Sequence, residues 1–287
     1  MPAESHVVST SSLSPSALAD SAFIQRYGTW ALITGGSDGL GEQFARHAAS
    51  RGLNCLLVAR IAGKLEALAS KLREELGVEV RTRSLDLTAD GAAAELKVAA
   101  GGLEIGLVIF NAGGDTAGTR FLESPIEDWR ALMRRNVDLL TEACHHFGGA
   151  MVKRGRGGLL IVGSEAALGG QGKLSIYTAT KGYAINFGES LWQELRPHGV
   201  HVLNAIIGAT DTPHLRHALA SRGLPLAAVT LANPDDVARF MVNGLARGPT
   251  LFYGADETSA DLPKSSRRRR ERVEELTKLL EQFYGAD

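Results

Sequence analysis

The 287 residues are enough for one sizeable domain or two small ones. Hydrophobic residues make up 44% and charged residues 22%, and the formal net charge is −1. This composition is typical of a soluble globular protein and argues against a nucleic-acid partner held by net charge. No stretch approaches the unbroken apolar length of a membrane span, so we also expect no membrane-spanning segment.

The first residues contain many serines and no lysine or arginine before residue 21, so they lack the features of a signal peptide. We expect a flexible tail over residues 1–24. Cys55 and Cys144 each lie in an apolar segment, which suits buried thiols in a reducing compartment better than a disulfide. A cytoplasmic location is the expectation.

From residue 30 onward, short apolar runs alternate with longer stretches of helical period. Most of the runs are almost continuously apolar, as strands covered on both faces must be. The pattern predicts a single α/β domain over residues 25–260, with a doubly wound, seven-stranded parallel sheet and helices on both faces. The predicted strands are 30–34, 54–59, 78–87, 105–111, 157–164, 200–207 and 250–255.

A glycine-rich turn, "TGGSDGLG" at 34–41, follows the first predicted strand and opens a helix. Glycines remove the Cβ atoms that would keep backbone N–H groups away from a pyrophosphate at the helix N-terminus. The turn therefore predicts a dinucleotide site. Its cofactor-binding residues are Gly35, Ser37, Asp38, Gly39, Leu40 and Gly41.

The end of the second predicted strand indicates which dinucleotide is bound. Ala59 stands where a carboxylate would hold the 2′-hydroxyl of NAD, and Arg60 follows, able to pair with a 2′-phosphate. Lys64, one helical turn later, adds a further positive charge. NADP is favoured, although Asp38 brings a negative charge close to the same phosphate and Arg60 can also be read as an ordinary surface arginine.

Five further motifs follow in chain order: "DLT" from Asp86, "NAG" from Asn111, "RRN" ending at Asn136, Ser164, and "YTATK" from Tyr177 to Lys181. Together with the glycine turn, they make residues 28–213 resemble the short-chain dehydrogenases/reductases, a family of single-domain Rossmann-fold oxidoreductases. The resemblance implies that Asp86, Leu87, Asn111, Ala112, Gly113, Thr212, Tyr177 and Lys181 also contact the cofactor. It also implies a homodimer or homotetramer.

Tyr177 and Lys181 lie four residues apart, so on a helix both side chains share one face and the ammonium favours the ionised phenol. That arrangement suits a proton donor to a carbonyl oxygen. Ser164 would hydrogen-bond the same oxygen. The resemblance implies that Lys181 binds the nicotinamide ribose and that Asn136 holds a water for proton resupply. The alternative is a surface tyrosine beside a solvated lysine.

Two later segments carry separate predictions. The leucine-rich stretch around 209–235 is expected to be a mobile lid over an apolar substrate, or else an irregular packed connection. Residues 261–287 are expected to form a basic amphipathic helix, with Arg267–Arg270 as a solvated face and Val273, Leu276, Leu280 and Phe283 as an apolar stripe. An anionic partner is the alternative role for the arginines.

The predicted function is an NADP-dependent oxidoreductase that interconverts a ketone and a secondary alcohol on an apolar or part-apolar substrate, such as a steroid, an acyl chain or an aryl ketone. No metal site is predicted. A catalytically silent nucleotide-binding regulator or scaffold, using the arginine-rich helix for a partner, is the second hypothesis. An epimerase or dehydratase is less favoured, because the glycine spacing typical of those enzymes, T-G-x-x-G-x-x-G, is absent from the chain.

Overall fold

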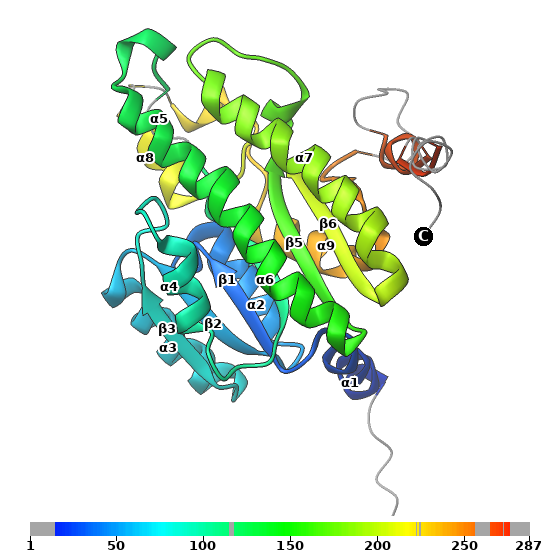
Figure 1. The fold of residues 1–287 in the computed structure, drawn as a ribbon. Helices are drawn as coiled ribbons and strands as arrows, with labels where there is room; N and C mark the ends of the chain where they lie inside the picture. The colour runs from blue at the N-terminus through cyan, green and yellow to red at the C-terminus, as the bar shows by residue number, and fades with distance from the viewer. Residues whose placement is uncertain are drawn as a thin grey trace, which may run out of the picture.

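A computed structural model describes residues 15–114, 118–221, 223, 225–255, 265–271 and 273–275. One sheet of seven parallel strands, in the order β3-β2-β1-β4-β5-β6-β7, forms its centre (Figure 1). The predicted doubly wound α/β domain is confirmed. The strands are β1 (Trp30–Thr34), β2 (Asn54–Ala59), β3 (Val80–Ser84), β4 (Ile105–Phe110), β5 (Gly157–Ser164), β6 (Val200–Ile207) and β7 (Thr250–Phe252).

Helices cover both faces of this sheet because successive strand residues point to opposite sides. In β1, Ala31 and Ile33 pack with α2 (Gly39–Ala49), α3 (Ala62–Leu76) and α9 (Pro234–Asn243). Trp30 and Leu32 instead pack with α4 (Ala92–Ala99), α6 (Leu139–Arg154) and α7 (Ser175–Leu195). Two hydrophobic cores result, one on each face. Cys55 and Cys144 lie buried in these cores as free thiols, as expected.

Two predicted strands are longer than the observed ones. Residues 78–87 were predicted as one strand, but β3 pairs with β2 only from Val80 to Ser84 and stops where β2 stops, at Ala59. The run from residue 250 likewise ends its pairing with β6 at Phe252. A strand at the edge of a sheet has one neighbour, so it ends where its pairing with that single neighbour ends.

The N-terminal prediction is wrong in part. A flexible tail was expected to residue 24, but helix α1 spans Pro15–Tyr27. Phe23 and Tyr27 are buried, with ring centroids 4.6 Å apart, and the Tyr27 hydroxyl lies 2.8 Å from His201 Nδ1 of β6. Two aromatic side chains at helical spacing therefore anchor the segment to the domain. Residues 1–14 lie outside the described part of the chain.

A basic amphipathic helix was expected over residues 261–287. The described part of this segment is helical at 266–271 and 273–275, and its arginines are not all solvated. The Arg269 guanidinium donates to the carboxylate of buried Glu189 in α7, with 3.2 Å between Nη2 and Oε2. Arg270 Nη2 donates to the Gly248 carbonyl at 2.7 Å. Of the expected apolar stripe, Val273 packs against the core. Leu276, Leu280 and Phe283 lie outside the described residues.

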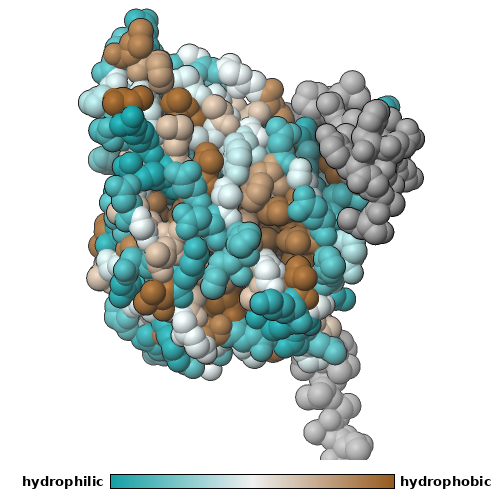
Figure 2. Space-filling model, in the orientation of Figure 1, coloured by the Kyte–Doolittle hydropathy of each residue, from teal (hydrophilic) through white to brown (hydrophobic). Residues whose placement is uncertain are grey.

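The surface seen in Figure 2 mixes hydrophilic and hydrophobic residues, with hydrophobic ones at the end where α5 (Ile126–Met133) begins. There, Phe121, Leu122 and Ile126 have 46%, 91% and 52% of their surface exposed. No described helix is both long enough and apolar enough to span a membrane.

Candidate active site

The turn between β1 and α2 is tight, and its glycines make it so. The amides of Gly35 and Gly36 both donate to the Val58 carbonyl of β2, at 2.8 and 3.3 Å. A Cβ on Gly41 would stand 2.0 Å from the Gly35 carbonyl oxygen, which no side chain can tolerate. Leu40 points into the core, so its backbone alone can face a ligand. The turn keeps the backbone open at the N-terminus of α2, as a pyrophosphate site requires.

Asp38 stands immediately before α2 and makes no side-chain hydrogen bond to the helix start. Its carboxylate instead pairs with Lys64 Nζ at 2.7 Å, so part of the positive charge expected from Lys64 is already balanced. Arg60 is exposed at the end of β2. It is close enough to Asp86 to contribute to the lowered pKa of that carboxyl, although hydrogen bonds from Thr88 are the larger cause. Leu87 is buried.

The segment after β4 lies beside the glycine turn. Asn111 Nδ2 donates to the Gly35 carbonyl at 3.0 Å, and the Ala112 amide donates to the Thr34 carbonyl at 3.1 Å. From the other side, Thr212 caps helix α8 (Pro213–Ala220) and lies close to Gly39. Residues far apart in the sequence, predicted to contact one dinucleotide, therefore meet at the carboxyl edge of the sheet, where ligands of such folds bind.

Tyr177 and Lys181 share one face of α7, as their spacing predicts. Lys181 Nζ lies 5.8 Å from the centroid of the Tyr177 ring and donates to the Val162 carbonyl of β5 at 2.8 Å. The lysine is 7% exposed. Burial, and secondly the positive charge of Arg135, lower the pKa of Lys181 to about 8.

Ser164 is the last residue of β5, the strand whose Val162 carbonyl accepts the hydrogen bond from Lys181. Its Oγ accepts a hydrogen bond from the Ala166 amide at 3.2 Å, at the start of the short helix η3 (Glu165–Leu168). Because the hydroxyl accepts there, its own hydrogen can point elsewhere. Ser164 is therefore able to donate to a bound oxygen.

Asn136 lies in a π-helical turn, η2 (Arg134–Asp138), between α5 and α6. Its Nδ2 donates to the Gly113 carbonyl at 3.3 Å and to Thr180 Oγ1 at 3.1 Å, and its Oδ1 accepts from Arg135 Nε at 3.2 Å. Sequence reasoning found Asn136 but missed Arg135 and Thr180. Both lie inside the quoted motifs "RRN" and "YTATK", which assigned them no role. The π-turn and the crossing of α7 orient them toward the amide.

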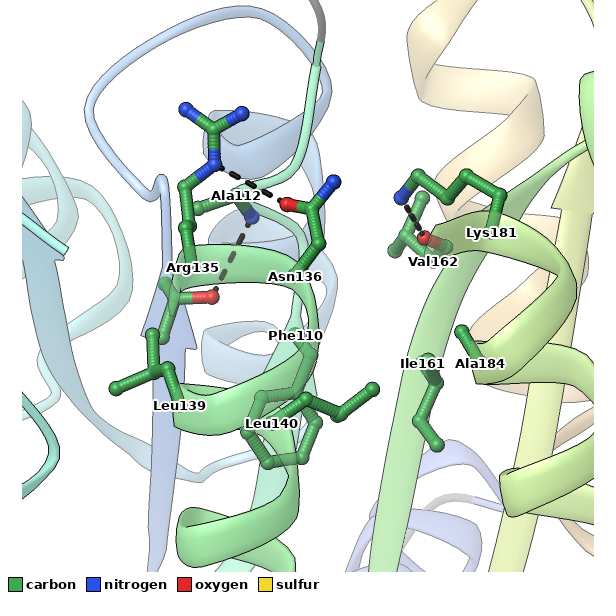
Figure 3. A pocket seen from close by; sticks show the side chains of 11 residues that line it. Phe110, Ala112, Arg135, Asn136, Leu139, Leu140, Ile161, Val162, Lys181 and Ala184 are labelled. Carbon is green, nitrogen blue, oxygen red and sulfur yellow. Dashed lines mark hydrogen bonds between the residues drawn. The ribbon is translucent and has the colours of Figure 1, made fainter. Parts of the chain in front are cut away.

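A cavity of about 20 Å³ is lined by Arg135, Asn136 and Lys181 (Figure 3). Its volume suits about one water molecule, which needs roughly 10–15 Å³. The polar lining comes from Thr34, Arg135, Asn136 and Lys181, and the apolar lining includes Phe110, Leu139, Leu140 and Ile161. In the part of the chain that the structure describes, no group of three or more His, Cys, Asp or Glu side chains could hold a metal ion.

Comparison with known proteins finds oxidoreductases among the relatives of this chain. Curated relatives include the very-long-chain 3-oxoacyl-CoA reductases of Rattus norvegicus (31% identity; 63% of this chain, 59% of that protein) and Mus musculus (32%; 62% and 58%). The chain thus spans less than two thirds of these relatives' length.

Solved structures are similar over a larger share of the chain. A short-chain dehydrogenase from Sphingobium yanoikuyae in complex with NADPH superposes with a TM-score of 0.75, at 27% identity over 88% of this chain and 95% of that one. A bulky-bulky ketone specific alcohol dehydrogenase from Comamonas testosteroni does so with a TM-score of 0.71, at 25% identity over 91% and 95%. The family model described as short chain dehydrogenase matches residues 29–222, most of the chain. This protein belongs to the short chain dehydrogenase family.

Proposed function

We propose that the protein is an NADP-dependent oxidoreductase that interconverts a ketone and a secondary alcohol. The observation that carries the proposal is the pairing of Tyr177 with buried Lys181 on one face of α7. This pair stands at the same edge of the sheet as a glycine turn that fits a dinucleotide. An acid/base next to a cofactor crevice is the arrangement that carbonyl reduction needs.

The residues around the crevice fit the cofactor. The turn containing Gly35, Ser37 and Gly41 would hold the pyrophosphate, and Arg60 would pair with the 2′-phosphate of NADP. Lys64 contributes less, since Asp38 already engages it. The remaining contacts would come from Asp86, Leu87, Asn111, Ala112, Gly113 and Thr212. When bound, NADPH supplies the hydride for carbonyl reduction. The NADPH held by the Sphingobium relative supports this choice.

In the direction of reduction, the Tyr177 hydroxyl gives its proton to the carbonyl oxygen, and Ser164 donates a hydrogen bond to the same oxygen. Lys181 stabilises the phenolate that remains. A lysine pKa of about 8 lets Lys181 both hold and release a proton near neutral pH. The small cavity beside Asn136 and Lys181 offers a place for the water through which that proton is replaced.

The substrate proposed is a ketone with a bulky or acyl group, as the relatives' names suggest. We propose that segment 209–235 is a lid over the substrate. Its ends are joined by the bridge between Thr210 and Ala232. Between them, α8 lies close to the glycine turn at Gly39 and, through His214, to Gly114. Such a segment spans the crevice between two of its walls.

We also propose a cytoplasmic homodimer or homotetramer. The exposed apolar side chains of Phe121, Leu122 and Ile126 support an association surface, because contiguous apolar surface commonly marks one. The scaffold hypothesis is less favoured, since Arg269 and Arg270 are engaged by their own chain.

The test replaces Tyr177 by Phe and follows NADPH absorbance with bulky ketones and 3-oxoacyl thioesters. Tyr177→Phe is expected to lose turnover by about 10²–10⁴-fold, because the proton donor is gone, while NADPH still binds by fluorescence titration. Tyr183→Phe is the matched control. The Tyr183 hydroxyl is hydrogen-bonded to Thr141 on α6, away from Lys181, so the variant should keep turnover. Wild-type turnover by Tyr177→Phe would refute the proposed role. NADPH binding with no ketone reduced by the wild type would favour the scaffold.

A further inference from the structure

Arg135 is a half-buried cation at the wall of the cavity. It lies within the "RRN" motif, but the expected constellation of Ser164, Tyr177, Lys181 and Asn136 gives it no role. Its Nε donates to Asn136 Oδ1 at 3.2 Å, as Figure 3 shows. Its Nη2 donates to the Gly114 carbonyl, in the segment after β4. The planar guanidinium is thus held in two directions, by its own helix turn and by the loop above the cavity.

The contact with Arg135 helps to fix the orientation of the Asn136 amide. A guanidinium has donors and no acceptor, so the atom facing Arg135 must be the amide oxygen. The amide nitrogen then faces Gly113 and Thr180, where it donates two hydrogen bonds. The turned amide would set donor against donor at Arg135 and acceptor against acceptor at the Gly113 carbonyl, so the two contacts favour the same orientation.

Arg135 also places a second positive charge at the cavity that Lys181 lines. Among the residues that line the cavity, Arg135 and Lys181 are the ionisable ones, and both are cationic. Tyr177 faces Lys181 from their shared helix, and Asp86, after β3, interacts with the Arg135 charge from outside the cavity lining. Two cations around one small buried space repel each other, which makes it easier for Lys181 to release its proton. The charge of Arg135 adds to burial in lowering the pKa of Lys181.

We propose that Arg135 is a positioning residue of the active site: its guanidinium orients the Asn136 amide, and its charge prepares Lys181 to pass on a proton. This role rests on the proposed function, in which Lys181 relays the proton that Tyr177 gives to the carbonyl. It explains why a second cation stands beside a buried lysine, an arrangement that on stability grounds alone is unfavourable.

The first test titrates Lys181 directly, by NMR of the full chain carrying ¹³C-labelled lysine, with the signal assigned by its loss in Lys181→Met. Arg135→Gln removes the charge and keeps an amide that can donate, whereas Arg135→Lys keeps the charge. The Lys181 pKa is expected to rise by about one unit in Arg135→Gln and to stay within about 0.3 units in Arg135→Lys. Arg130→Gln removes an exposed arginine of α5 and should leave the titration unchanged. Thermal unfolding checks that each variant is folded.

The second test measures the pH dependence of kcat/KM for ketone reduction in the same variants. The alkaline limb, where Lys181 loses its proton, is expected to move upward in Arg135→Gln by the same amount as the titration. In Arg135→Lys the limb should stay, while turnover falls several-fold because an ammonium on a flexible stem lacks the planar fork that holds Asn136 and Gly114 in fixed directions. A folded Arg135→Gln variant with unchanged titration, or with a shifted titration and an unchanged limb, would overturn the role of Arg135. A wild type that reduces no ketone, yet shows the shifted titration in Arg135→Gln, would refute the proposed function instead.

Discussion

Lys181 is buried, which is unusual for a lysine: it is 7% exposed, and its ammonium donates a hydrogen bond to the Val162 carbonyl. Its pKa is about 8 in the folded protein against the ordinary 10.5. At neutral pH both folded and unfolded chains carry the charge, so folding must bury it at a cost. Between about pH 8 and 10.5 the unfolded chain binds more protons than the folded one, and stability therefore rises with pH across that window. Above it, neither state is charged and the cost is gone.

Replacing this lysine should therefore stabilise the fold even as it removes the proton relay. Lys181→Met is expected to raise the free energy of unfolding at pH 7 by about 1–3 kcal/mol, measured by urea denaturation. The gain should shrink as the pH rises from about 8 to 10.5. Lys71→Met, at an exposed position of α3, should stay within about 0.5 kcal/mol at every pH. A loss of stability at pH 7 in Lys181→Met would mean that the ammonium is a net structural contact.

At the scale of elements, helix α7 joins the active site to the C-terminal segment. It carries Tyr177 and Lys181 in its first turns and Glu189 further along. The buried Glu189 carboxylate accepts hydrogen bonds from Thr250 of β7, at 2.8 Å, and from Arg269. One carboxylate thus holds a helix, an edge strand and the C-terminal helix together. Without Arg269, the charge of the Glu189 carboxylate would stay buried, and of these two partners only the Thr250 hydroxyl would remain.

The two neighbouring arginines of this segment should therefore differ. Arg269→Met is expected to cost about 1–3 kcal/mol of unfolding free energy, because it leaves a mostly buried carboxylate without its cation. The Arg267 side chain is 60% exposed and pairs with Glu271. Arg267→Met should therefore lower the free energy of unfolding by less than about 0.5 kcal/mol. Glu189→Gln combined with Arg269→Met should cost less than the two separate losses added together. Equal effects of Arg267→Met and Arg269→Met would show that the Glu189 contact does not stabilise the fold.

At the scale of the whole molecule, the sheet brings the ends of β1, β4, β5 and β6 to one edge, where the glycine turn, Asn111, Ser164 and Thr212 meet. A ligand bound at that edge contacts segments that are together only in the folded chain. Binding must therefore stabilise the fold as a whole, by about 2.7 kcal/mol when the ligand stands at about 100 times its Kd.

NADPH at that concentration is expected to raise Tm by about 5–8 °C in a thermal-shift assay. An equal concentration of NADH should raise it less, since Arg60 has no 2′-phosphate to pair with. Gly41→Ala should remove the shift, because its Cβ would stand 2.0 Å from the Gly35 oxygen and force the turn open. Gly63→Ala is the matched control, with open space around the added Cβ, and should keep the shift. A full NADPH shift in Gly41→Ala would place the dinucleotide away from this turn.

The sequence alone was sufficient for features whose cause is local. Apolar runs and helical periods predicted all seven strands, and the glycine spacing and the interval between Tyr177 and Lys181 predicted a turn and a shared helix face, because each depends on residues close together in the chain. Only the tertiary structure decided where β3 ends, that α1 is anchored through Tyr27, that Arg269 reaches Glu189, and that Arg135 and Lys181 line one cavity. Those outcomes depend on contacts between distant segments, and on a π-turn that has no signal in the residue pattern, so they exist only once burial has brought the segments together.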